Sequence, residues 1–128
     1  LAYVTIASDG DASDFCDLTV ARYALANGGN STRGIFAGGN SNGSVNTIDY
    51  ITIASTSNAI DFGDLNVTRE YMSGVSSSTR AVFGNGTDSN KGLDFVVIAS
   101  TGNATDFGDL NEDQEAAQAI SNAHGGLG

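Results

Sequence analysis

Short runs of β-branched and aromatic residues alternate along the chain with runs of glycine, asparagine and serine. In residues 47–55, TIDYITIAS, successive positions alternate so that Tyr50 falls on one side and Asp49 on the other, a pattern that predicts a β-strand. Residues 33–39, RGIFAGG, and 80–86, RAVFGNG, predict a second strand type. Each of these ends in glycines, which suit a turn because they accept positive φ.

Two further strand types complete a unit. Residues 21–29, ARYALANGG, match 68–76, TREYMSGVS, and DFGDL at 61–65 predicts a short fourth strand. Residues 112–120, EDQEAAQAI, have helical propensity, but the register of the repeat places them on the third strand type, so we favour a strand there. Four short antiparallel strands per unit indicate an all-β protein.

One phrase occurs three times, at residues 5–18, 52–65 and 97–110. Its Asp-Phe pairs recur at spacings of 47 and 45 residues, and they are Asp14 and Phe15, Asp61 and Phe62, and Asp106 and Phe107. Repeats of this length predict an array of similar units, here one repeat region over residues 1–128 with units at about 2–49, 50–94 and 95–128. We interpret the phenylalanines as filling one core slot between neighbouring units, with the flanking Asp and Gly making a turn.

The order of the strands resembles that of kelch repeats. Arg22 is followed by GIFAGG, which ends in Gly38 and Gly39, then by TIDYITIAST and by DFGDL. The chain departs from the kelch pattern in having phenylalanine where tryptophan is usual, and in the GNG at residues 84–86. The resemblance implies a β-propeller built of four-stranded antiparallel blades.

The number of predicted strands indicates how such a propeller would be completed. The predicted strands form two whole central units and two half units, about three blades' worth, whereas propellers commonly have four to eight blades. Either the segment is cut from a longer chain, which we favour, or several chains share one ring. Two chains, as a homo-oligomer, would give six blades.

The phrases DFGDL, STRG and IDY are also similar in style to the kelch-like repeats of predicted structural and tail proteins of bacteriophages, marine cyanophages especially. This second resemblance implies a virion or extracellular location. It also implies that the partners are other virion proteins or a glycan or protein of the host surface.

Composition limits the partners. With 15 acidic and 5 basic residues, the chain carries a formal charge of −10, which argues against nucleic acid because phosphate recognition needs clustered Lys and Arg. No stretch approaches the ~20 apolar residues of a membrane-spanning helix, so we expect no membrane insertion.

The sequence offers little support for a catalytic or metal-binding site. DFG resembles the magnesium-binding motif of kinases, but no other kinase motif accompanies it. The DGDASD at residues 9–14 has the acidic character of a calcium loop, yet the other copies lack its leading aspartates. Cys16 replaces a glycine of the other copies, and His124 is the only histidine, without a second metal-binding side chain beside it. We therefore expect no enzyme, no metal and no cofactor.

Four of the five basic residues recur in register, and they are Arg22 with Arg69 and Arg33 with Arg80. Each guanidinium either bridges carboxylates or carbonyls within the scaffold, which we favour, or contributes to a ring of arginines that binds an anionic surface. The terminal unit carries Gln114 in place of the first arginine.

Three hypotheses for function follow. The first is a non-enzymatic propeller module of a phage tail or fibre, which displays the variable loops at residues 27–32, 38–46 and 84–92 for host attachment or virion assembly. The second is a cellular kelch-like protein-interaction domain. The third is a sugar-active enzyme built on a propeller.

Overall fold

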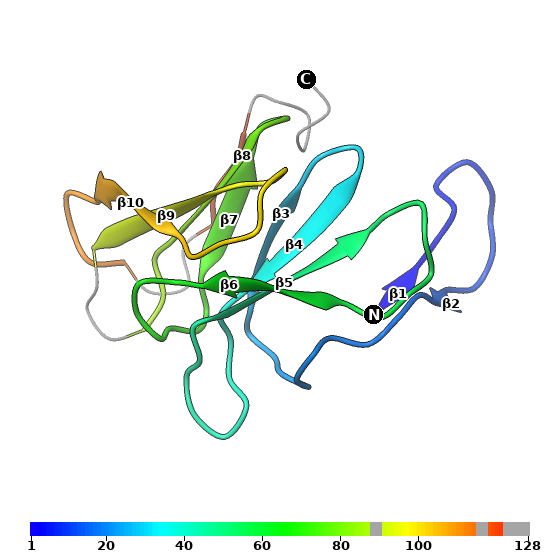
Figure 1. Cartoon of the computed structure of the whole chain (residues 1–128), viewed down its shortest axis with the longest axis horizontal. Helices are drawn as coiled ribbons and strands as arrows, with labels where there is room; N and C mark the ends of the chain where they lie inside the picture. The colour runs from blue at the N-terminus through cyan, green and yellow to red at the C-terminus, as the bar shows by residue number, and fades with distance from the viewer. Residues whose placement is uncertain (88–90, 115–117, 122–128) are drawn as a thin grey trace.

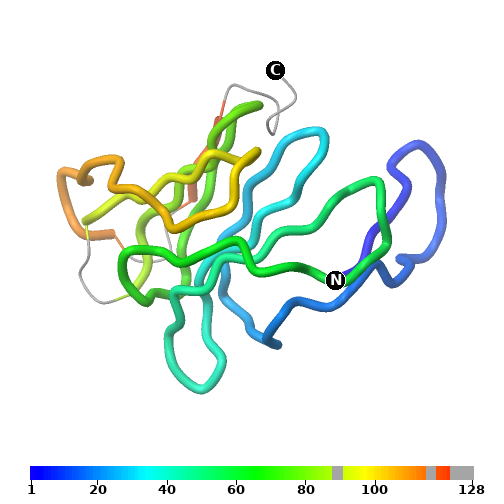
Figure 2. Tube along the Cα trace, in the orientation of Figure 1, coloured from blue at the N-terminus to red at the C-terminus, as the bar shows by residue number. Residues whose placement is uncertain are grey.

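A computed structural model of the chain describes residues 1–87, 91–114 and 118–121. Within these residues the protein is all-β and forms three antiparallel sheets (Figures 1 and 2). The N-terminal hairpin pairs β1 (Ala2–Tyr3) with β2 (Ser13–Asp14). The first sheet contains β3 (Ala26–Gly29), β4 (Arg33–Ala37), β5 (Thr47–Thr52) and β6 (Ile60–Asp64). The second sheet contains β7 (Ser73–Ser76), β8 (Arg80–Gly84), β9 (Gly92–Val97) and β10 (Thr105–Asp109).

The all-β prediction is confirmed, and each predicted strand type is present. The strands predicted at 21–29 and 68–76 are shorter than expected, because only their last four residues before each turn enter the ladder. The strand predicted at 112–120 does not form over residues 112–114 or 118–120, and residues 115–117 lie outside the described part of the chain. The described residues form open sheets rather than a closed ring, and they include no helix that could cross a membrane.

Both four-stranded sheets are simple meanders in which each strand pairs with the next one along the chain. In the first sheet, Ile35 of β4 lies opposite Tyr50 of β5. A boundary between repeat units at residue 50 therefore falls inside β5, so each sheet draws its strands from two adjoining units.

A β-bulge explains the repeated DFG phrase. Along β6, Asp61 pairs with Asp49 and Gly63 pairs with Ile48, which leaves Phe62 as the extra residue of the bulge. The φ of Gly63 is +146°, a value that glycine adopts without strain, and a Cβ there would collide with the backbone of Gly102. The Asp and Gly of the phrase therefore lie in a bulged strand and not in a turn as predicted.

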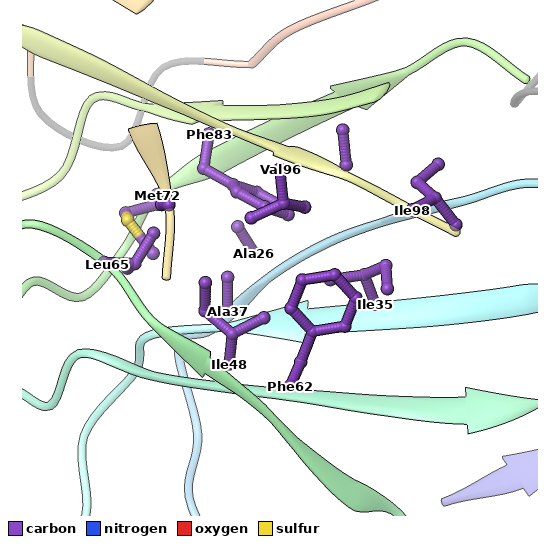
Figure 3. Close-up of a cluster of buried hydrophobic side chains, with 12 residues drawn as sticks. Ala26, Ile35, Ala37, Ile48, Phe62, Leu65, Met72, Phe83, Val96 and Ile98 are labelled. Carbon is purple, nitrogen blue, oxygen red and sulfur yellow. The ribbon is translucent and has the colours of Figure 1, made fainter. Parts of the chain in front are cut away.

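The main hydrophobic core lies between the two four-stranded sheets (Figure 3). Its side chains are almost fully buried, and the largest of them are Ile35, Ile48 and Phe62 from the first sheet and Phe83, Val96 and Ile98 from the second. The inner strands β3 and β7 approach closely because Gly74 has no side chain, since a Cβ there would collide with the carbonyl oxygen of Asn27.

A repeated pair of hydrogen bonds joins each unit to the one before it. The backbone N–H of Ala104 donates to the carbonyl of Asp64 (2.8 Å), and the N–H of Asp64 donates to Oδ1 of Asn103 (3.1 Å). The N-terminal hairpin is held against the first sheet in the same way, by bonds from Ala59 to Asp17 and from Asp17 to Asn58.

The three repeated phenylalanines differ in their surroundings. Phe62 is 2% exposed in the core, Phe15 is half-buried in the hairpin, and Phe107 is 52% exposed on the second sheet. Each ring packs edge-on against the aromatic residue of the neighbouring strand, which is Tyr50 for Phe62 and Phe95 for Phe107. The slot between units is thus filled at Phe62, whereas Phe107 has no following sheet to cover it in the described part of the chain.

We expect Phe62→Ala to lower the free energy of unfolding by about 3–5 kcal/mol, because it opens a cavity between the sheets. Ile60→Ala is the control, since Ile60 lies two residues earlier on the same strand and is 55% exposed. Its loss should stay below about 1 kcal/mol. Urea denaturation of both variants measures the difference, and equal losses would show that Phe62 does not fill the core.

Candidate functional site

The Asp49 carboxylate is the centre of a buried polar cluster in the first sheet. Arg22 Nη1 donates to Asp49 Oδ2 at 2.7 Å, and both side chains are fully buried. Thr19 donates to the same carboxylate from its hydroxyl (2.7 Å) and its backbone N–H (3.2 Å). The guanidinium also donates to the carbonyls of Gly38, Phe36 and Val20. This cluster ties the loop before β3 to strands β4 and β5.

The second sheet repeats the cluster around Asp94. Arg69 Nη2 lies 3.5 Å from Asp94 Oδ2, and Arg69 Nη1 donates to the carbonyl of Gly92 at 2.6 Å. Asn66 takes the place of Thr19, donating to the carboxylate from its side-chain amide (2.6 Å) and its backbone. Burial lowers the pKa of the Arg69 guanidinium, and the neighbouring Asp94 carboxylate opposes that shift.

The other arginine pair lies on aromatic rings. The Arg33 guanidinium is 4.6 Å from the centre of the Tyr50 ring, and Arg80 is 4.8 Å from that of Phe95. Arg33 also donates to the carbonyl of Ile98 at 2.8 Å, so it bridges the two sheets. Arg80 is exposed to solvent.

The structure therefore separates the four repeated arginines. Arg22 and Arg69 are directed into the interior, and an anionic ligand would have to break the buried clusters to reach them. Arg33 is half-buried between the sheets, which leaves Arg80 as the one member of the set open to a ligand.

A shallow cleft of mixed polar and apolar lining lies beside the inner strands, with a volume of about 390 Å³. Glycine backbone forms much of its wall, and the side chains around it include the polar Asn27, Asn30 and Ser76 and the apolar Ile53 and Val75. Asn30 closes one end by donating from its amide to the carbonyl of Ser78 (2.9 Å), which joins the β3–β4 and β7–β8 turns.

The three variable loops lie at two opposite ends of the strands (Figure 1). Residues 27–32 form the end of β3 and the turn beside the cleft, and residues 38–46 connect β4 to β5 at the other end. Residues 84–92 follow β8 at that second end, and residues 88–90 among them lie outside the described part of the chain. The loops therefore do not form one continuous surface.

The remaining sequence candidates are not brought together. Cys16 is 5% exposed, and burial raises the pKa of its thiol. The aspartates of residues 9–14 are exposed, and no group of metal-binding side chains forms within the described ranges. His124 lies outside the described residues.

Asp49 and Asp94 were not singled out by the sequence analysis. The signal was present, because each is an acidic residue in a strand otherwise rich in apolar residues and each recurs in register with an arginine. In a strand that is buried on both faces, alternation separates the two sides but does not show that the side with the aspartate is covered.

No protein-family model matches the chain, and no curated protein matches it. The resemblances to kelch repeats and to phage structural proteins therefore stay predictions.

We expect Arg22→Gln and Asp49→Ala each to destabilise the fold by about 3–5 kcal/mol, because either one leaves a buried charge without its partner. The double variant should lose less than the sum of the two, since it removes both charges. Asp61→Ala, opposite Asp49 but exposed, is the control and should stay within about 0.5 kcal/mol. Additive losses in urea denaturation would contradict a coupled pair.

Proposed function

We propose that the protein is a non-enzymatic binding module, built as part of a kelch-like β-propeller, and that it serves in the tail or a fibre of a phage virion. The observation that supports binding is the cleft at the inner strands, where glycine backbone and the exposed side chain of Asn27 lie beside the joined turns of both sheets. Backbone and amide groups of this kind donate and accept hydrogen bonds without titrating.

The chemistry of the cleft favours a neutral glycan as the ligand. Sugar hydroxyls both donate and accept hydrogen bonds, as does the exposed side-chain amide of Asn27. The net charge of −10 repels polyanionic glycans at long range. Arg33 in the cleft wall is engaged with Tyr50 and Ile98, so its charge is directed to the scaffold.

The scaffold is better suited to presenting binding loops than to catalysing a reaction. In each sheet a buried ion pair fixes the loop that leads into the inner strand, whereas the turns around the cleft are exposed and differ between repeats. Loops on a rigid frame are where recognition is usually placed.

Calorimetric titration with neutral host-surface glycans tests the proposal. Asn27 is exposed and lines the cleft, so Asn27→Ala should weaken binding about three- to tenfold, the equivalent of one neutral hydrogen bond of about 0.5–1.5 kcal/mol. The control is Asn42→Gly in the loop at the opposite end, where φ is +73° and glycine fits. It should leave affinity unchanged.

Three results would count against the proposal. An equal loss in the control variant would place recognition elsewhere, and release of cleaved sugar would identify an enzyme. Absence of the protein from purified virions, measured by mass spectrometry, would remove the virion assignment.

A further inference from the structure

The second sheet carries an apolar surface that the repeat identifies as half of an interface. We call it the open face, and it consists of Val82, Leu93, Phe107 and Leu110, which line a cavity of about 370 Å³. Their equivalents in the first sheet are Ile35, Ile48, Phe62 and Leu65, which are at most 3% exposed because the second sheet covers them. The open face thus has the side chains of a core position, and no sheet formed by the described residues covers it.

The N-terminal hairpin carries the complementary surface. Val4 and Ile6 are 57% and 98% exposed. They occupy the repeat positions of Val96 and Ile98, which are 3% and 0% exposed because they pack against the first sheet. The nearly fully exposed isoleucine and the exposed valine beside it offer an apolar surface to a partner.

The polar contacts of the known interface also have equivalents on these two surfaces. Asp109 occupies the position of Asp64, whose backbone is clamped by an asparagine and an alanine of the following unit. The hairpin presents Asp11 and Ala12 at those positions, both exposed, and the carboxylate of Asp11 can accept the same bond. Arg80 would then reach the carbonyl of Ile6, as Arg33 reaches that of Ile98.

The positions of charged residues in the repeat support the same pairing. In both described sheets a buried arginine meets a buried aspartate. The next arginine position is Gln114 and the preceding aspartate position is Ala2, so both charges are missing together. A sheet assembled from the C-terminal segment and the N-terminal hairpin would therefore contain no unpaired buried charge.

The C-terminal segment already lies where such a sheet would begin. Ser121 Oγ donates to the carbonyl of Ser76 in β7 at 3.0 Å. On its other side, β7 contacts β3 through a bond from the Gly29 N–H to Ser76 Oγ. Residues 118–121 thus lie beside β7, on the side away from β3, although they form no strand.

The open face and the hairpin lie at opposite ends of the long axis of the molecule (Figures 1 and 2), so one chain cannot bring them together without a large rearrangement. We propose that a second copy of this chain docks its N-terminal hairpin on the open face, head to tail. At each joint the N-terminal hairpin of one chain then covers the open face of the other. Two copies closing on each other would form a ring of about six blades, within the usual range of propellers.

Analytical ultracentrifugation of the intact chain tests this inference, which does not depend on the glycan proposed above. We expect a mass of twice the 13.0 kDa of one chain. Ile6→Asp and Phe107→Asp should each give monomers, because a charge in an apolar interface is costly to bury. Ile6 is too exposed to affect the fold of a single chain, so circular dichroism of Ile6→Asp should be unchanged.

The matched control is Val67→Glu, at an exposed apolar position where the third repeat itself carries Glu112, and this variant should remain a dimer. Mixing Ile6→Asp with Phe107→Asp should restore association, because the intact hairpin of one variant meets the intact open face of the other. A monomeric intact chain, a dimeric Ile6→Asp variant, or a mixture that stays monomeric would each overturn the proposal.

Discussion

A buried carboxylate on the third strand of each four-stranded sheet fixes the rest of the structure. An aspartate with no access to water must have every oxygen paired, because an unpaired buried charge costs several kcal/mol. Asp49 meets this requirement only when Thr19 and Arg22, from the loop before the sheet, are in place. Thr19 and Arg22 thereby hold the loop before the sheet against the strands, although this loop contains little regular structure.

Small residues and one bulge then determine how the sheets approach. Gly74 lets the inner strands β3 and β7 come together, and the bulge in β6 leaves Phe62 as an extra residue that enters the core beneath Val96 and Ile98. The backbone clamp from Asn103 and Ala104 onto Asp64 holds the outer strands at the same interface. Each sheet is thus incomplete without a neighbour, which is why the open face on the last sheet has the composition of a core.

The contacts that hold the sheets together also limit which side chains can bind a ligand. Three of the four arginines that recur in the repeat are committed to the scaffold, with Arg22 and Arg69 in ion pairs and Arg33 between the sheets. What remains free at the inner strands is backbone and amide, arranged around a shallow cleft. Such a surface recognises hydroxyl and amide partners by shape and hydrogen bonding, and variation in its turns alters recognition without disturbing the core.

The repeat, the strand types and the all-β class were determined by the sequence itself, because alternation over TIDYITIAS and recurrence of DFGDL are local properties of the chain. The bulge at Phe62, the buried state of Asp49 and the contrast between Phe62 and Phe107 were decided only by tertiary structure. Burial of a residue depends on which sheet covers it, and Phe62 and Phe107 have nearly identical sequence surroundings. Likewise, the alternation that placed Asp49 on the side opposite Tyr50 could not show that this side is covered, since the cover comes from Thr19 and Arg22, which are distant in the chain.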